Sequence, residues 1–474
     1  MLQIVVPAIH PTETETFRRA ENSYAVRELA RRAGIRRSTF ETWCIENDGN
    51  GYLSVYVNPG TNSRVRFPGI FPDFLKKMLP SKCRTATASW MENAPGSRSG
   101  IGDFKIPFSR ADQEAVGPLF VPESNTSVRC SIDLLASLLL VLARFEETLD
   151  VPRDEHDRFS AFSSLAWRDA YLHRPIVDEW GLAFAEAVQY LLPGWQPEQK
   201  SLSVKLGHDV DELGIPFRLR NAISHTVRRR APHATLRDLA AISGRTQTTY
   251  QLLLRQVVGL AKARGIDSAV YWKFANSGPH DTGYDPRHPA ILSMIANFQQ
   301  MGVELGIHPS YQSFDSPAKF RREVSALKQL LELGSVGGRQ DFLRWGPETW
   351  LAWEEQGIAY DASVGFAEHV GFRAGTCHPY RPWLLEPGRE AKLLEIPLIA
   401  MDSTLLGYMN LQEEAALEKV RDCIASCRAV GGVFSLVWHN TRIMNPRHRW
   451  LYIQILDSLQ GSANYDWRSA YSEI

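Results

Sequence analysis

Hydrophobic and polar positions follow one pattern before Gly194 and another after it. In the second part, short apolar runs alternate with longer stretches whose apolar residues recur at helical spacing. Strands that alternate with helices form parallel sheets, so this part is predicted to be a parallel α/β domain. The expected strands are 202–206, 268–274, 303–307, 335–337, 358–361, 393–398 and 433–438, and the expected helices are 247–264, 288–301, 317–333, 347–357 and 411–430. Seven such strands indicate a barrel rather than an open sheet.

The first part of the chain predicts a smaller, mixed structure. Residues 20–33, 131–149 and 178–192 have helical spacing, and 52–57 alternates as a strand does. Ser131 is placed to cap the second of these helices, and Asp133 to lie in its first turn. The fold class is therefore α/β: a distorted (β/α)7 barrel with an N-terminal α/β domain. The expected domains are 1–125, a small α/β domain without an assigned role, 126–195, a helical connecting region, and 196–474, the barrel.

Charge and composition narrow the class of protein further. The 474 residues include 53 Lys and Arg against 53 Asp and Glu, whereas nucleic-acid-binding proteins usually have a basic excess. The first residues lack the features of a signal peptide, and no apolar run is long enough to cross a bilayer. The six scattered cysteines have neither metal-site nor disulfide spacing. These observations predict a cytoplasmic protein that binds no nucleic acid and has no transmembrane segment.

Polar side chains suited to catalysis follow the ends of the expected strands. Asp209 and Asp211 follow the first strand, His308 follows the third and His439 follows the last. The carboxyl ends of barrel strands open on one mouth, so these four side chains are expected to surround one cavity. Two carboxylates so close repel each other, and a divalent cation would remove that repulsion. Oxygen and nitrogen ligands together indicate zinc or another first-row metal, whereas the alternative is a helix-capping loop beside core histidines.

An irregular stretch at 366–382, rich in aromatic and basic residues, has neither helical nor strand spacing. Long irregular loops inside compact domains are often functional, so we expect this one to cover the barrel mouth. Arg373 and His378 would then reach the substrate, together with Tyr311 near the third strand. Arg373 has the forked donors that suit a carboxylate or phosphate. Cys377 in the same stretch is expected to be inert, and the alternative for the whole stretch is a surface connection.

The order of these segments resembles that of the polysaccharide deacetylases, the NodB-like proteins of carbohydrate esterase family 4. LGHDVD at 206–211, GVELGIH at 302–308 and SLVWHN at 435–440 are similar to three motifs of that family, and Arg339 matches a fourth. The resemblance implies a metal-dependent deacetylase, with zinc as the expected ion. It further implies Asp211 and His308 as metal ligands, Asp209 as general base, His439 as general acid and Arg339 as the group that orients the base.

Two positions depart from the pattern of that family. Val210 separates the two aspartates, which are adjacent in the family, so the division of roles between them stays open. Gln312 stands where the family has a second histidine ligand, so a third protein ligand must come from elsewhere. The candidates are His378, His369 and His208. The chain also resembles a bacterial branch of the superfamily that has an N-terminal extension.

The predicted function is removal of an N- or O-linked acetyl group from a sugar or polysaccharide precursor by a metal-dependent hydrolase. Two alternatives stay open. The missing second histidine is also expected of a catalytically inactive carbohydrate-binding or scaffold protein on the same barrel. A glycoside hydrolase would instead use Asp209 and Asp361 as a carboxylate pair, at a separation characteristic of that chemistry. The oligomeric state does not follow from the sequence.

Overall fold

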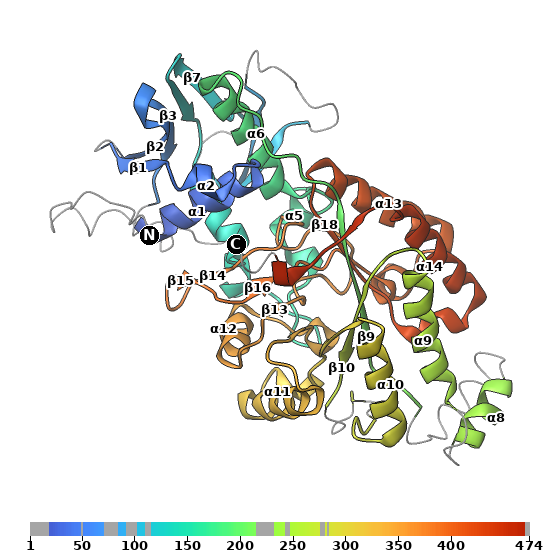
Figure 1. The fold of residues 1–474 in the computed structure, drawn as a ribbon. Helices are drawn as coiled ribbons and strands as arrows, with labels where there is room; N and C mark the ends of the chain where they lie inside the picture. Colours follow the sequence, from blue (N-terminus) through green and yellow to red (C-terminus); the bar gives the residue numbers. More distant parts are fainter. Residues whose placement is uncertain are drawn as a thin grey trace.

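The computed structural model describes residues 19–48, 51–70, 84–91, 102–109, 115–214, 232–241, 247–274, 280–281 and 284–469. The first residues, from which the absence of a signal peptide is predicted, lie outside these ranges. An N-terminal unit of small sheets and helices lies beside a second part, in which helices surround a curled sheet (Figure 1).

The N-terminal unit contains two small sheets and the helices α1, α4 and α6. One sheet has the strand order β1-β2-β3-β8-β7 and the other the order β5-β4-β6. The ring of Phe184 on α6 contacts those of Phe67 and Phe120, so this helix covers the first sheet. The bounds are α1 Arg19–Arg32, β1 Cys44–Asn47, β2 Tyr52–Asn58, β3 Ser63–Pro68, β4 Arg84–Ser89, β5 Phe104–Ser109, β6 Ala115–Pro118, β7 Phe120–Ser124, β8 Ser127–Cys130, α4 Leu134–Leu142 and α6 Ile176–Leu191.

Most of the elements expected in this unit are present, but one helix is shorter than predicted. The helix expected at 131–149 is confirmed only as α4, because Arg144 adopts a left-handed conformation with φ 53° and ends it. Ser131 does not cap α4, since its hydroxyl donates instead to the carbonyl of Pro118 at 2.7 Å. The residue at the cap position is Asp133.

The second part is built on an all-parallel sheet that curls on itself. Its strands follow the order β16-β13-β12-β11-β10-β9-β18-β17, and the short β19 pairs with β9. A parallel order of this kind is what the alternating strands and helices of the sequence predict. The bounds are β9 Ser203–Val210, β10 Ser268–Trp272, β11 Glu304–Ile307, β12 Gly337–Gly338, β13 Tyr360–Asp361, β16 Leu394–Glu395, β17 Ala400–Met401, β18 Val433–Val437 and β19 Ala463–Asn464.

The strand count differs from the predicted (β/α)7 barrel. All seven expected strands have counterparts, but β17 is an additional strand in the path of eight. β16 and β17 belong to one segment, 394–401, which reaches both edges of the sheet. The Ile396 amide donates to the Asp361 carbonyl at 2.8 Å on one edge, and the Ile399 amide donates to the Ser435 carbonyl at 3.2 Å on the other. This segment therefore connects the two ends of the curled sheet.

Helices cover the outside of the curled sheet (Figure 1). Their ends show the expected local chemistry: Thr248 and Gln251 form a capping box at the start of α9, and Gly265 follows its end with φ 74°. The bounds are α8 Pro232–Ala241, α9 Thr249–Lys262, α10 Pro289–Gln300, α11 Pro317–Leu331, α12 Pro347–Glu355, α13 Glu413–Ala429 and α14 Pro446–Ser458. No described helix is both long enough and apolar enough to cross a membrane.

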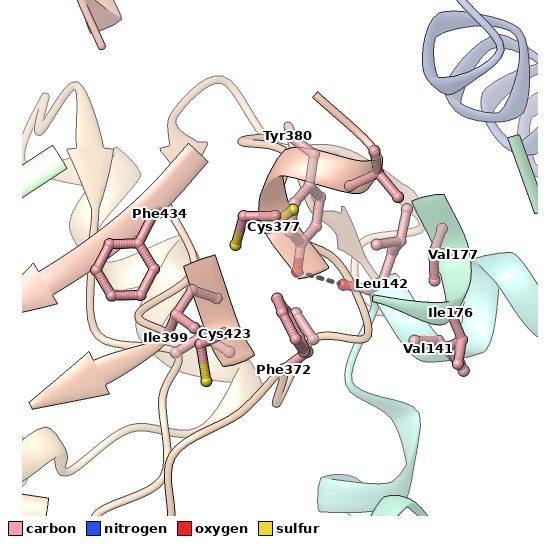
Figure 2. Close-up of a cluster of buried hydrophobic side chains, with 14 of the residues drawn as sticks. Val141, Leu142, Ile176, Val177, Phe372, Cys377, Tyr380, Ile399, Cys423 and Phe434 are labelled. Carbon is pink, nitrogen blue, oxygen red and sulfur yellow. Dashed lines mark hydrogen bonds between the residues drawn. The ribbon is translucent and has the colours of Figure 1, made fainter. Parts of the chain in front are cut away.

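One hydrophobic core continues from the N-terminal unit into the curled-sheet part. Val141 of α4 and Val177 of α6 lie in the same cluster as Phe372 and Tyr380 (Figure 2). The Tyr380 hydroxyl donates to the Leu142 carbonyl at 3.0 Å. The stretch 366–382 therefore packs against the N-terminal unit. The sequence alone instead predicts that it covers the barrel mouth.

Candidate functional site

Charged side chains gather where the parallel strands of the curled sheet end. The carboxyl ends of barrel strands lie at one end of the barrel, so residues that are distant in sequence meet there. The arrangement is built from short loops that begin directly after a strand. Asp211 follows β9, Lys273 follows β10, His308 follows β11, Arg339 and Asp341 follow β12, Asp402 follows β17 and His439 follows β18.

Asp211, His308 and Asp341 form a group with the chemistry of a metal site. One ligand atom from each lies within 4.8 Å of the others. His308 Nε2 is 3.2 Å from Asp211 Oδ1 and 3.1 Å from Asp341 Oδ1. His308 Nδ1 donates to the Arg339 carbonyl at 2.8 Å, which orients the ring and leaves Nε2 facing the carboxylates. Two carboxylates and one imidazole are a donor set that fits a divalent first-row ion.

The titration of this group reflects the crowding of its charges. Burial would lower the pKa of His308, but Asp209, Asp211 and Asp341 raise it to about 10. Burial would raise the pKa of Asp211, but Lys273 and the nearby histidines hold it well below its ordinary value. The Asp211 carboxylate is therefore ionised and stabilises positive charge placed beside it.

Lys273 supplies part of that positive charge. Its ammonium lies 2.8 Å from Asp341 Oδ2, 3.3 Å from Asp211 Oδ1 and 3.8 Å from Asp281 Oδ1. Burial would lower the pKa of Lys273, but these carboxylates raise it above its ordinary value, so the lysine is charged. Because Lys273 bonds Oδ2 of Asp341, it orients that carboxylate with Oδ1 toward His308.

Asp209 lies beside this group and is bound by an arginine. Arg339 Nη1 donates to Asp209 Oδ1 at 2.8 Å, and Arg339 Nε donates to the Ala362 carbonyl at 2.9 Å. Both side chains are buried. Gly207 makes room for the guanidinium, because a Cβ at this position would lie 2.8 Å from Arg339 Nη1. The pair holds a carboxylate in a fixed orientation at the edge of the metal-type group.

His439 follows β18, which pairs with β9 on the side away from β10, and reaches the group from there. Its Nε2 lies 3.5 Å from Asp211 Oδ2, and its Nδ1 donates to Asp402 Oδ1 at 2.6 Å. Asp402 also accepts from Arg442 Nε at 3.1 Å. Burial would lower the pKa of His439, but Asp402 and then Asp211 raise it to about 9. At neutral pH this imidazole is therefore protonated and has a proton available on Nε2.

The structure thus brings Asp209, Asp211, His308, Arg339 and His439 into one group. The two aspartates have different surroundings. Asp209 is buried and bonded by Arg339, whereas the side chain of Asp211 is 39% exposed and faces His308. The intervening Val210 is the last residue of β9, so Asp211 belongs to the loop beyond the strand.

None of the histidines proposed as a third ligand lies in this group. His208 uses both ring nitrogens, with the Trp438 carbonyl 2.7 Å from Nδ1 and the Ser268 hydroxyl 3.2 Å from Nε2. His369 Nδ1 bonds the Val370 carbonyl at 2.6 Å. His378 Nε2 bonds the Val430 carbonyl at 3.1 Å. Asp341 occupies the place for which these histidines were considered.

Arg373 and His378 are also not placed to bind a substrate at this group. Arg373 is buried, and its Nε donates to Glu147 Oε1 at 2.9 Å while its Nη1 donates to the Gly365 carbonyl at 2.9 Å. His378 is buried near α1 and Lys200, and burial lowers its pKa to about 3. These positions follow from the packing of 366–382 against the N-terminal unit and correct the expectation of a lid. Tyr311, in contrast, donates its amide to Asp281 Oδ1 at 3.1 Å and so adjoins the site.

Asp361, the second carboxylate of the glycoside hydrolase alternative, is fully buried at the end of β13. Its Oδ1 accepts from the Ser363 amide at 3.0 Å, and burial raises its pKa to about 6. A side chain without exposed surface cannot contact a glycosidic bond, so Asp209 and Asp361 do not form the required pair.

Four charged residues of the site were not assigned a role from the sequence: Lys273, Asp281, Asp341 and Asp402. Asp341 and Asp402 follow strands, so their positions alone could have marked them. Lys273 directly follows β10 and could have been found in the same way. Asp281 lies in the loop after β10, and nothing in its sequence surroundings singles it out.

Comparisons with known proteins give distant matches. The family model that matches covers residues 76–193 and describes a family of unknown function, DUF7033. No curated protein matches the chain. Three similar solved structures are described as a polysaccharide deacetylase from Mycobacterium smegmatis (16% identity, 60% of this chain and 93% of that chain, TM-score 0.41), a polysaccharide deacetylase from Pseudomonas aeruginosa (15%, 60%, 95% and 0.38) and an allantoinase (15%, 58%, 91% and 0.38). The case for a function rests on the side chains of this chain.

Proposed function

We propose that this protein is a metal-dependent hydrolase that removes an acetyl group, N- or O-linked, from a sugar or a polysaccharide precursor. The observation that supports this most is the group of Asp211, His308 and Asp341 between a bonded carboxylate and a protonated imidazole. Acyl transfer to water needs a base, an acid and a stabiliser of negative charge, and each has a candidate here. The sequence motifs that resemble those of polysaccharide deacetylases direct the proposal to acetylated sugars.

Asp211, His308 and Asp341 would hold the metal ion, for which zinc is the first candidate. When bound, such an ion polarises the acetyl carbonyl and lowers the pKa of the attacking water. Lys273 keeps the Asp341 carboxylate oriented, because it bonds Oδ2 and leaves Oδ1 beside His308. The three donors therefore face the same point before any ion arrives.

Asp209 would act as the general base. Arg339 bonds one oxygen of Asp209 and fixes the carboxylate, so the second oxygen can accept a proton from water. Arg339 itself is fully buried and acts as a positioning residue for Asp209. The exposed Asp211 suits the role of ligand better than Asp209, which already bonds a guanidinium.

His439 would act as the general acid. Asp402 accepts the proton on Nδ1 and stabilises the imidazolium, while Nε2 faces the metal-type group. The leaving amine or alkoxide of the sugar would receive the Nε2 proton as the bond to the acetyl carbon breaks. Arg442 holds the other oxygen of Asp402 and so orients this acid indirectly.

A second candidate function is a carbohydrate-binding protein without catalysis. Lys273 favours it, because its ammonium already neutralises part of the charge of Asp211, Asp281 and Asp341. In that case the lysine stands where a metal ion would otherwise be needed. Measurement of bound metal separates the two functions.

We expect purified protein to contain about one divalent metal ion per chain. Asp211→Asn combined with His308→Ala should remove the ion, because the pair loses one carboxylate charge and the imidazole nitrogen; Asp341→Asn alone should weaken its binding, because it removes one negative charge from the donor set. Elemental analysis and a zinc titration with a competing chelator measure both effects. Asp457→Asn, on the exposed face of α14, is the matched control.

Dialysis against a chelator should abolish acetate release from acetylated saccharides, and added Zn²⁺ should restore it. Equal metal content in the wild type and the double variant would show that these residues are not the ligands. Stable, folded protein without metal and without acetate release would favour the binding protein.

A further inference from the structure

Four aromatic rings form a cluster beside the site, which we call the aromatic wall: His156, His280, Tyr311 and Phe342. Their ring centroids lie 4.2 Å apart for His280 and Tyr311, 4.8 Å for His156 and Phe342, and 5.2 Å for Tyr311 and Phe342. His280 is exposed, and the other three are partly exposed. Rings that pack on one another and still face solvent leave surface that a ligand can cover.

The aromatic wall adjoins the charged group at two points. Phe342 directly follows Asp341, and the Tyr311 amide donates to Asp281 Oδ1, whose carboxylate faces Lys273. A ligand whose acetyl group lies at Asp341 would therefore have its next few atoms against these rings.

One part of the aromatic wall comes from the N-terminal unit. His156 lies in the loop 153–159, which Arg153 and Phe159 close by a β-bridge. Its Nδ1 is 3.1 Å from the Tyr311 hydroxyl. The loop thus reaches from the N-terminal unit to the end of β11, so the site is composed of both parts of the chain.

Two arginines hold the aromatic wall in place. Arg158 Nη1 donates to the Phe342 carbonyl at 2.9 Å, and its Nη2 donates to the Tyr408 hydroxyl at 3.1 Å. Arg344 Nε donates to the His156 carbonyl at 2.9 Å, and its Nη1 donates to the Tyr311 carbonyl at 3.0 Å. Both guanidinium groups also form ion pairs, Arg158 with Asp154 and Arg344 with Asp315.

The four rings of the aromatic wall carry no carboxylate or ammonium group, which suits a neutral ligand. Burial and Arg158 lower the pKa of His156, so its imidazole is uncharged at neutral pH. The Arg344 guanidinium lies over the Tyr311 ring and His280 packs close to it, so the surface left for a ligand belongs mainly to the exposed His280 and the partly exposed His156 and Phe342. The face of a pyranose ring presents C–H groups of slight positive charge, which pack on the negative face of an aromatic ring. The hydroxyl groups of the pyranose ring would face the polar atoms at the edges of the aromatic wall.

We propose that the aromatic wall is the binding subsite for the pyranose ring of the acetylated sugar, and that loop 153–159 of the N-terminal unit is part of it. This inference rests on the proposed function for the identity of the ligand. Binding and hydrolysis are separate measurements, so each can fail without the other.

The test is saturation-transfer NMR and calorimetry with the full chain and two probes, N-acetylglucosamine tetrasaccharide and O-acetylated xylotetraose. We expect transfer from aromatic protons to ring protons of at least one probe. His156→Ala and Phe342→Ala should each weaken its binding about tenfold, the effect of losing one ring contact. Tyr311→Phe, which keeps the ring, should stay within about twofold.

Trp450→Ala, an exposed aromatic residue on α14, is the matched control and should bind as the wild type does. His156→Ala changes a loop side chain, so it tests the inference if Phe342→Ala fails to fold. The inference is overturned if neither probe binds, or if His156→Ala, together with Phe342→Ala where that variant folds, binds like the wild type. Asp209→Asn should retain binding and lose acetate release; retained release in that variant would instead contradict the proposed function.

Discussion

Asp209→Asn is expected to lower the turnover number for acetate release by roughly a hundred- to ten-thousandfold, the usual contribution of one general acid or base. Asparagine has almost the same shape as aspartate, but its amide cannot accept the proton of the attacking water. Arg339 would still find an oxygen to bond at this position, so the geometry changes little. The measurement is kcat on the best acetylated saccharide at saturating concentration.

The reading of this variant depends on metal content and stability. Because Asp209 is assigned as base and not as ligand, Asp209→Asn should retain the metal of the wild type. If Asp209→Asn loses the metal as well as the activity, Asp209 is a metal ligand. Turnover within roughly threefold of the wild type would show that Asp209 is not the base. Asp457→Asn again controls for the loss of one carboxylate elsewhere.

Glu147→Ala is expected to lower the free energy of unfolding by about 3–5 kcal/mol, the cost of removing one partner of a buried ion pair. Glu147 is buried, and its carboxylate accepts from Arg373 Nε at 2.9 Å and from Arg144 Nε at 2.8 Å. Both arginines are buried as well. Without Glu147, the buried Arg373 guanidinium loses its carboxylate partner, whereas Arg144 keeps its ion pair with Glu146. Urea denaturation followed by circular dichroism gives the free energy.

Glu155→Ala is the matched control, because the Glu155 side chain is 86% exposed and its loss should change stability by less than about 0.5 kcal/mol. Glu147→Ala combined with Arg373→Met should recover part of the loss, since the double change removes the charge that Glu147→Ala leaves uncompensated. A Glu147→Ala protein as stable as the wild type would mean that water reaches this ion pair.

Periodicity and strand position were enough to predict that these polar side chains lie together. The segments of β9, β11 and β18 are recognisable in the sequence as short, largely apolar runs between helical stretches, and their ends give Asp209, Asp211, His308 and His439. The carboxyl ends of parallel strands converge whatever the loops do, so these four residues were grouped correctly without any contact information. The same rule covers Asp341 and Asp402, although no motif marked them.

The surroundings of the irregular segments could not be predicted in this way. Arg373 lies in a stretch without helical or strand spacing, and its partner Glu147 is 226 residues away. The choice between a lid and a packed interface depends on which surface 366–382 covers, and periodicity says nothing about that. His156 is a similar case, because it meets Tyr311 across 155 residues.

The third ligand shows how a motif can mislead. The family pattern directs attention to position 312, and Gln312 is exposed there with its amide oxygen bonded by Lys319 at 3.0 Å. The carboxylate proposed as the third ligand comes instead from the neighbouring strand end, where Asp341 Oδ1 lies 3.1 Å from His308 Nε2, the nitrogen that also faces Asp211. A site can keep its donor count while the element that supplies the donor changes.

The core shared by the two parts of the chain has a consequence for how this protein can be inherited. Val141, Ile176 and Val177 are buried beside Gly375, in the same cluster as Phe372 and Cys377, so this boundary is apolar on both sides (Figure 2). A barrel cut free at the start of β9 would expose this patch to water and to other chains. Recombination that moved the barrel alone to a new partner would therefore produce an aggregating fragment. We therefore expect the two parts to be inherited together as one gene segment. Substitutions on one side of the boundary should be accompanied by compensating substitutions on the other.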